Sequence, residues 1–326
     1  MSTKIRIKSA SGFTSLKLIL LQYKRVFIVC DRNVAQYAER IASAPTLAID
    51  ADESEKNMDK VLVICRWLLE KGADRNSLVL AVGGGVTTDV VGFAASIYMR
   101  GVRYANVPTT LLGQVDAGIG GKTGVNFLSY KNMLGVIRQP EFTYISSEPL
   151  KTLPPKQFYS GAAELLKTFI IKDARRYEAA VRVLSGSKSL DELKPLVAEA
   201  AKIKAKIVKR DENEKGERRV LNLGHTWGHA IEWYQRTHPG SGEFSHGEAV
   251  AIGIIQAARK SEALKIASPG LADKLCADFK ACGLPTEMPF PIVEIEEAMH
   301  KDKKSEDSKI NYVLIRKIGD VVIKKL

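Results

Sequence analysis

The sequence predicts an α/β domain built on a parallel sheet, followed by a mainly α-helical domain. Two observations lead to this fold class. Short apolar segments alternate with amphipathic segments over the first 110 residues, as in successive βαβ units. After about residue 150 the pattern is helical almost to the end of the chain. A length of 326 residues is enough for two domains with separate cores.

The elements follow from the hydrophobic pattern in chain order. Buried strands are predicted at residues 26–30, 46–49, 78–82 and 104–107, with helices at 34–43, 56–70 and 86–98. The second half is predicted to be helical at 161–184, 190–209, 228–234, 247–264 and 271–282, with strands at 312–315 and 321–323. The pair Pro154 and Pro155 predicts a hinge, which gives domains 1–153 and 154–326.

Composition narrows the class of protein. The excess of 49 Lys and Arg over 37 Asp and Glu gives a charge of +12, which favours anionic partners such as nucleic acid, membrane surfaces or phosphorylated small molecules. The four cysteines form no C-x-x-C pair, which indicates a reducing compartment. No apolar run approaches the roughly 18 residues of a membrane span, so we expect a soluble, cytoplasmic protein without a membrane partner.

A glycine-rich turn follows the third predicted strand. Gly83, Gly84 and Gly85 lie between that strand and a helix, where bare backbone and free N–H groups suit a phosphate or pyrophosphate. The turn is not a G-x-G-x-x-G fingerprint, and a simple tight turn remains an alternative. The later string 118–123 ends like a P-loop, but Asp116 stands where that motif needs its first glycine, which argues against it.

Histidines and a carboxylate cluster in the second half. Three of the five histidines lie in two short motifs, with His225 and His229 four residues apart and His246 at the start of the next helix. Upstream, Glu164 and Lys167 share one face of an apolar helix. Two imidazoles and one carboxylate form a common open zinc site. The alternatives are buried, hydrogen-bonded histidines and a simple Glu164–Lys167 ion pair.

These motifs together resemble the 3-dehydroquinate synthase family of the sugar-phosphate cyclases. The first 80 residues match only through Asp31, Asn33, Glu53 and Lys56. The other matching strings run in the family's order: GGGVTTDVVGFAAS (83–96), YMRGV (98–102), VPTTLLGQVDAGIGGKTGVN (107–126), YKNMLG (130–135), TLPPKQFYSGAAELLKT (152–168), RRVLNLGHTWGHAIE (218–232), HGEAVAIG (246–253) and DKK (302–304).

The resemblance implies a Rossmann-like first domain, a metal-binding second domain, and a role for each matching residue. Zinc or cobalt would be held by Glu164, His225 and His246. NAD would contact Asp31, Asn33, Glu53, Lys56, Gly84, Gly85, Val86, Asp89, Thr109, Thr110, Leu112, Asp116, Lys122, Lys131, Thr152 and Leu153. The substrate would meet Asp116, Lys122, Asn132, Lys167, Lys204, Arg218, Asn222, His229, Lys303 and Lys304. Arg100 would reach the phosphate site of a second copy, which implies a homodimer.

The implied activity is that of a carbon–oxygen lyase in the shikimate pathway. A phosphorylated keto acid, 3-deoxy-D-arabino-heptulosonate 7-phosphate, would yield 3-dehydroquinate and phosphate through transient oxidation by NAD, β-elimination, re-reduction and aldol closure. Another sugar-phosphate cyclase and a metal-dependent polyol dehydrogenase are the alternatives. A nucleic-acid binder is disfavoured because the basic stretches are interleaved with acidic residues, as at 210–215.

Overall fold

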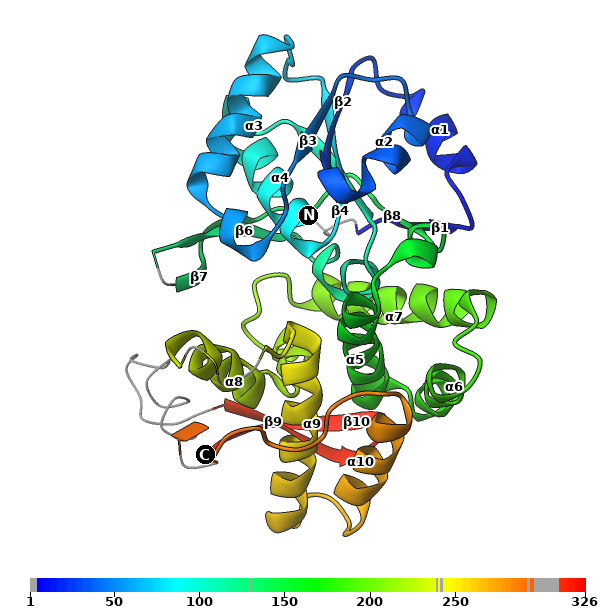
Figure 1. Ribbon diagram of the computed structural model, residues 1–326, viewed down its shortest axis with the longest axis vertical. Helices are drawn as coiled ribbons and strands as arrows, with labels where there is room; N and C mark the ends of the chain where they lie inside the picture. The colour runs from blue at the N-terminus through cyan, green and yellow to red at the C-terminus, as the bar shows by residue number, and fades with distance from the viewer. Residues whose placement is uncertain (1–4, 129, 239, 241–242, 292–293, 296–310) are drawn as a thin grey trace. The chain divides into compact units, whose positions relative to one another are not determined.

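The computed structural model describes residues 5–128, 130–238, 240, 243–291, 294–295 and 311–326 (Figure 1). The chain packs as two compact units. Unit 1 comprises Met1–Leu153 and Val197–Asn213, and unit 2 comprises Pro154–Leu196 and Glu214–Leu326. One junction between the units lies between Leu153 and Pro154, and residues 197–213 belong to unit 1.

Unit 1 is built on a six-stranded parallel sheet with the strand order β1-β8-β5-β4-β2-β3. The strands are β1 (Ile7–Ala10), β2 (Val26–Asp31), β3 (Thr46–Ile49), β4 (Leu78–Gly83), β5 (Arg103–Pro108) and β8 (Thr143–Ser146). The four strands predicted from apolar runs are all present in the sheet. The pattern does not reveal β1 and β8, because each has only four residues and each mixes polar with apolar side chains.

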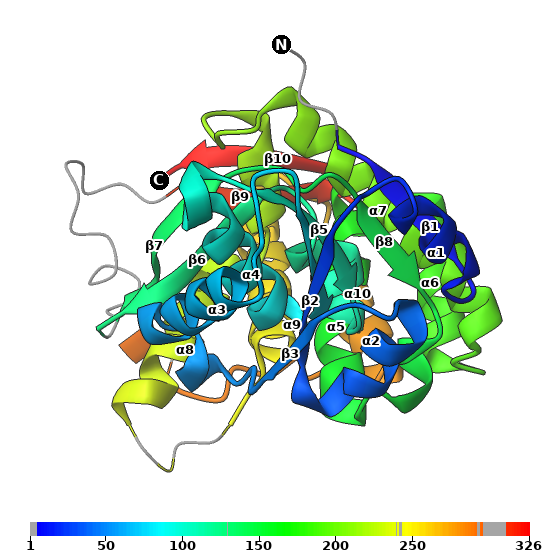
Figure 2. The ribbon, with the colours of Figure 1, turned by 90° about the horizontal axis from the view of Figure 1, so that it is seen from above.

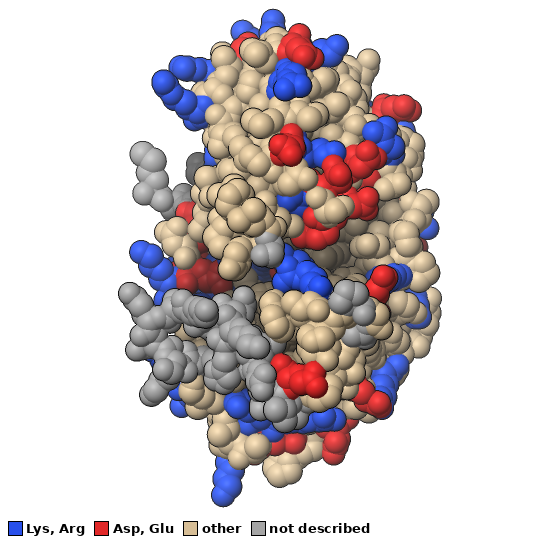
Figure 3. All heavy atoms as spheres, turned by 60° about the vertical axis from the view of Figure 1, so that its left-hand side comes forward, with Lys and Arg blue, Asp and Glu red and all other residues tan. Residues whose placement is uncertain are grey.

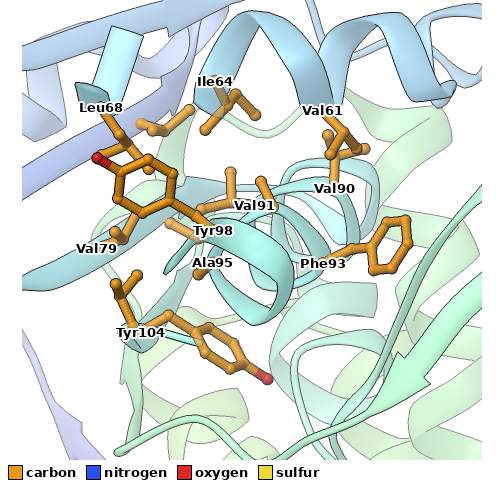
Figure 4. Packing of buried hydrophobic residues seen from close by; sticks show 14 of the residues in the cluster. Val61, Ile64, Leu68, Val79, Val90, Val91, Phe93, Ala95, Tyr98 and Tyr104 are labelled. Carbon is orange, nitrogen blue, oxygen red and sulfur yellow. The ribbon is translucent and has the colours of Figure 1, made fainter. Parts of the chain in front are cut away.

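Helices cover both faces of this sheet (Figure 2). On one face α1 (Thr14–Leu20) and α2 (Ala35–Ile41) contribute Leu16 and Ile41 to a core that also contains Ile28. On the other face α3 (Met58–Glu70) and α4 (Gly85–Ile97) pack over β4. Figure 4 shows Ile64 and Val91 on facing helices within this second core. Burial on both faces explains why β4 is apolar throughout.

The strand order reverses direction next to β2. The chain passes from β2 outward to β3, whereas β4, β5 and β8 extend the sheet on the opposite side. The carboxyl ends of β2 and β4 therefore flank a topological switch point, where ligands bind in open α/β sheets. Asp31 is the last residue of β2, and Gly84 follows the last residue of β4. These two predicted NAD contacts therefore lie at the switch point.

Two irregular elements complete unit 1. A π-helical turn covers Gly113–Ala117, and a hairpin joins β6 (Lys122–Phe127) to β7 (Tyr130–Ile137). The hairpin was not predicted because seven of the eight residues of β7 are exposed and show no core-facing alternation.

Unit 2 surrounds the central helix α9 (His246–Ala263). Around α9 pack α5 (Pro155–Lys172), α8 (His225–Thr237), α10 (Leu271–Ala281) and the strand β9 (Asn311–Lys317), which pairs with β10 (Asp320–Lys325). The predicted helical segment 161–184 contains two helices, α5 and α6 (Ala174–Ser185). Asp173 leaves the helical conformation between them, and its carboxylate accepts the Arg176 N–H at 3.0 Å as an N-cap.

Helix α7 (Leu190–Arg210) begins in unit 2 and ends in unit 1. None of the helices in the described ranges is both long and apolar enough to cross a membrane.

Candidate functional site

A buried carboxylate lies at the centre of unit 2. Glu164 is fully buried in the middle of α5. Its Oε2 forms an ion pair with Lys167, which lies one turn later and whose side chain is 1% exposed. Among the described residues, neither oxygen of Glu164 accepts a hydrogen bond of ordinary geometry. A buried carboxylate is costly without a cation beside it; Lys167 supplies one at Oε2, while Oε1 faces His225 and His246.

Two histidines complete a cluster around this carboxylate. The Nε2 atoms of His225 and His246 lie 3.8 and 3.5 Å from Glu164 Oε1. One donor atom from each of the three residues lies within 4.8 Å of the other two. The spacing and the Glu/His/His donor set fit a divalent cation such as zinc, with a position left for another ligand.

Glycines allow the helices to approach closely enough to form this cluster. A Cβ on Gly253 of α9 would lie 2.0 Å from the carbonyl oxygen of Gly224, which precedes His225. A Cβ on Gly247 would lie 2.1 Å from Ser160 O in α5. Backbone contact at these two crossings brings α8 and α5 against α9, and therefore brings the three candidate ligands together.

The electrostatics of the cluster favour positive charge. Burial lowers the pKa of His246, but the neighbouring carboxylates of Glu164 and Glu232 outweigh that effect and raise the pKa to about 10. The two carboxylates thus retain a proton on this imidazole in the metal-free protein. A divalent cation would take the place of that positive charge.

The other predicted residues of unit 2 lie on the elements next to the cluster. His229 meets His225 edge to face, with 5.3 Å between ring centroids. Arg218, 3% exposed, and Asn222 lie in the 3-10 segment Glu217–Asn222 that leads into α8. Asn222 donates a hydrogen bond of 2.7 Å to the carboxylate of Glu214. Lys303 and Lys304 lie outside the described residues.

In unit 1 the glycine turn forms the N-terminus of α4. Gly84 is the N-cap, and no side chain in the described part of the chain caps the helix there, so its first backbone N–H groups could face a ligand. A Cβ on Gly84 would lie 3.1 Å from the Thr110 side chain, so the turn packs tightly on the loop after β5. Thr109 N donates to Gly83 O at 2.8 Å and ties that loop to β4.

A buried lysine links two predicted site residues. Lys56 is 5% exposed and donates to Asp89 Oδ2 at 2.6 Å and to Asn132 Oδ1 at 2.5 Å. Burial raises the pKa of Asp89, and the lysine ammonium offsets this only in part. Asn132 has a left-handed backbone (φ 53°), and its N–H donates to the Asn126 side chain at 2.9 Å. Lys56 therefore joins α4 to the hairpin that carries Asn132.

A second lysine–carboxylate pair in unit 1 involves the π-helical turn. Lys204 in α7 is 7% exposed, and its Nζ donates to Asp116 Oδ1 at 2.6 Å and to Asp116 O at 2.8 Å. Lys204 therefore lies on the buried side of its helix, although its lysine-rich stretch looks like a solvated face in the sequence.

The remaining predicted residues are dispersed over unit 1. Asp31 caps the turn that contains Asn33, and the Glu53 carboxylate accepts a hydrogen bond of 2.9 Å from Asn126. Thr152 shares a 3.0 Å hydrogen bond with Tyr37 just before Leu153. Leu112 precedes the π-helical turn, while Lys122 and Lys131 are exposed on the hairpin and Arg100 is exposed after α4.

Comparison with known proteins settles the family. A model described as "3-dehydroquinate synthase N-terminal" matches residues 46–160, and one described as "3-dehydroquinate synthase C-terminal" matches residues 161–305. The chain belongs to the 3-dehydroquinate synthase family. A 3-dehydroquinate synthase from Acidithiobacillus ferrooxidans is 40% identical over 310 residues, which cover 91% of this chain and 84% of that relative.

Solved structures agree with this family fold. The 2-epi-5-epi-valiolone synthase ValA from Streptomyces hygroscopicus subsp. jinggangensis 5008, solved with NAD+ and Zn2+, has a TM-score of 0.89 at 27% identity. The match covers 100% of this chain and 94% of ValA. A 2-deoxy-scyllo-inosose synthase complexed with carbaglucose-6-phosphate, NAD+ and Co2+ has a TM-score of 0.84 at 24% identity, covering 98% and 93% of the two chains, and shows the shared fold.

Three side chains of this 3-dehydroquinate synthase family member contact the predicted residues but were not singled out in the sequence. Asn126 holds the Asn132 backbone, Glu214 holds the Asn222 amide, and Glu232 contacts His246. Glu214 lies in a charged stretch that resembles a solvated loop, so the pattern offers no signal for it. Glu232 does carry a signal, because it lies seven residues after His225 and thus on the same face of α8.

Proposed function

We propose that this chain is a 3-dehydroquinate synthase, which converts 3-deoxy-D-arabino-heptulosonate 7-phosphate into 3-dehydroquinate and phosphate. The buried cluster of Glu164, His225 and His246, in a chain that matches both halves of this family, is the observation that carries the proposal. The identity of 40% to a synthase of that name, against 27% to ValA, favours this substrate over that of a sister cyclase.

Glu164, His225 and His246 would hold a Zn2+ or Co2+ ion, since their donors are buried and close together. The glycine turn at Gly84 and Gly85 would hold the NAD pyrophosphate at the switch point of the sheet. When bound, NAD supplies reversible hydride transfer and the metal ion lowers the pKa of the substrate hydroxyls that it binds.

The side chains around these centres would bind the acidic substrate. The planar guanidinium of Arg218 suits the carboxylate, which it can bind through two parallel hydrogen bonds. Lysines suit the phosphate because each carries a compact positive charge. The predicted lysines are Lys122, Lys167 and Lys204, together with Lys303 and Lys304, which lie outside the residues that the structure describes. His229, beside His225, would relay a proton during the reaction through a ring nitrogen.

The distribution of charge supports small anions rather than nucleic acid as ligands. On the face shown in Figure 3, acidic and basic side chains are interspersed. A nucleic-acid binder would instead present a continuous basic stripe with aromatic side chains among the cations.

We also propose a homodimer in the cytoplasm. Arg100 lies in an exposed left-handed turn (φ 66°) directly after Met99 (φ 50°), and backbone strain of this kind is typical of functional sites. The hairpin exposes apolar side chains, among them Tyr130 at 60% and Met133 at 55%, which a second copy would cover. The cysteines at positions 30, 65, 276 and 282 are free thiols, which fits a reducing compartment.

The mass in solution tests the dimer. We expect light scattering at micromolar concentration to give a mass of about two chains of 35.8 kDa, because an Arg100 supplied in trans requires a stable pair. A mass of one chain under the same conditions would contradict the assembly but would leave the chemistry untouched.

Release of phosphate tests the reaction. Protein loaded with NAD and Zn2+ or Co2+ is expected to release one phosphate per heptulosonate phosphate consumed without accumulating NADH, because the hydride returns within each turnover. Metal-free protein is the control and should release none. If loaded protein releases no phosphate but steadily forms NADH from glycerol, the chain is a polyol dehydrogenase and the proposed function is wrong.

A further inference from the structure

Glu232 contacts the candidate metal centre without being one of the three ligands. It follows His225 and His229 along one face of α8, at spacings of seven and three residues. Its side chain is 11% exposed, and its Oε1 lies 3.4 Å from Nδ1 of His246. The opposite ring nitrogen, Nε2, lies 3.5 Å from Glu164 Oε1. The imidazole of His246 is thus held between two carboxylates, one at each nitrogen.

The second histidine shows the same arrangement with a different acceptor. Nδ1 of His225 lies 3.2 Å from the backbone oxygen of Leu223, and its Nε2 faces Glu164. An oxygen acceptor at Nδ1 keeps the proton on that atom and leaves the lone pair of Nε2 for a metal. Both ligand histidines therefore have an acceptor outside the cluster that selects the same tautomer.

The backbone of His246 is fixed independently of Glu232. Ser245 caps α9 in a capping box with Glu248, in which Ser245 N donates to Glu248 Oε2 at 2.7 Å. The next amide, Gly247 N, donates to Ser160 Oγ at 3.0 Å. These contacts fix the main chain but not the ring, and the His246 side chain remains 32% exposed. The ring itself contacts Glu164 and His225 within the cluster, and Glu232 contacts it from the other side at Nδ1.

We propose that Glu232 is a positioning residue of the metal centre, which orients His246 and fixes its tautomer through the Nδ1 hydrogen bond. The inference rests on the metal site of the proposed function, but not on the identity of the substrate. Outer hydrogen bonds of this kind raise metal affinity because they hold the ligand in its binding geometry before the ion arrives.

The test compares two substitutions of similar size. Glu232→Met removes the acceptor, and Glu232→Gln keeps an amide oxygen that can accept from Nδ1–H. Metal-stripped protein is titrated with Zn2+ against a chelating dye, and the visible absorption of the Co2+ form is recorded. We expect Glu232→Met to weaken metal affinity by about 10- to 100-fold and to alter the Co2+ spectrum. We expect Glu232→Gln to restore both to within a few fold of the wild type.

Glu243 supplies the matched control. Like Glu232, Glu243 precedes His246 in the sequence, but its side chain is 96% exposed. Glu243→Met should therefore leave the metal affinity unchanged. Wild-type metal affinity and Co2+ spectrum in Glu232→Met would overturn the proposal, even if the protein unfolded at a lower temperature. Equal weakening in Glu232→Met and Glu232→Gln would also overturn it. Absence of phosphate release by the loaded wild-type protein would refute the synthase function. The ratio of Zn2+ affinities between the wild type and Glu232→Met would still test the role of Glu232.

Discussion

Replacement of His225 by alanine is expected to abolish metal binding and to lower phosphate release by at least about 10³-fold, or roughly 4 kcal/mol of transition-state stabilisation. The reason is the size of the donor set. Glu164, His225 and His246 supply the three candidate ligand atoms of the cluster, and the two that would remain are too few for a stable zinc site. Metal content per chain after dialysis and the initial rate of phosphate release measure the two effects.

His238 provides the control for this substitution. It lies at the C-terminus of the same helix, stacked on Tyr234 with 4.0 Å between ring centroids, and is not part of the cluster. His238→Ala should therefore retain the metal and most of the activity. Equal metal content in His225→Ala and His238→Ala would remove His225 from the ligand set.

Some elements of the fold could be predicted because their burial leaves a clear pattern. All six residues of β4 are buried, and a strand covered on both faces appears as a continuous apolar run. The strand β8 is equally buried but consists of Thr, Tyr, Ile and Ser, so its burial depends on neighbours that are distant in the sequence. The exposed strand β7 has no core-facing pattern at all. Only pairing with other strands reveals these two: β8 pairs with β1 and β5 in the six-stranded sheet, and β7 pairs with β6 in the hairpin.

The same distinction applies to the candidate site. The compact motifs beside glycine make His225, His229 and His246 candidate ligands, and the resemblance to the family selects His225 and His246 among them. Lys56 could be assigned only by resemblance, as an NAD contact, whereas its Nζ bridges Asp89 and Asn132, which are 33 and 76 positions away. Such a bridge exists only after the sheet and the hairpin have folded. The sequence pattern therefore identifies the ligand types better than the side chains that hold them.

Substitution of Gly253 by alanine is expected to destabilise unit 2 and to weaken its metal site. Alanine would gain about 1 kcal/mol of helix propensity within α9. Against that gain, the new Cβ would lie 2.0 Å from Gly224 O and 2.9 Å from Gly224 C, and these are backbone atoms that cannot rotate away. Overpacking of this kind typically costs about 1–3 kcal/mol and more where backbone must move. Because backbone must move here, we place the cost at about 3 kcal/mol or more, which leaves a net loss of about 2 kcal/mol and a fall of roughly 5 °C in the midpoint of thermal unfolding.

The metal site should respond because Gly224 directly precedes His225. Relief of the clash requires α8 to move away from α9, which separates His225 from His246 and should weaken Zn2+ binding in the folded variant. Gly12→Ala is the matched control, since its Cβ would meet only Glu148 Oε2 at 3.4 Å, an ordinary contact. If Gly253→Ala unfolds at the wild-type temperature and binds Zn2+ as tightly, close backbone packing between Gly224 and Gly253 is not what assembles the site.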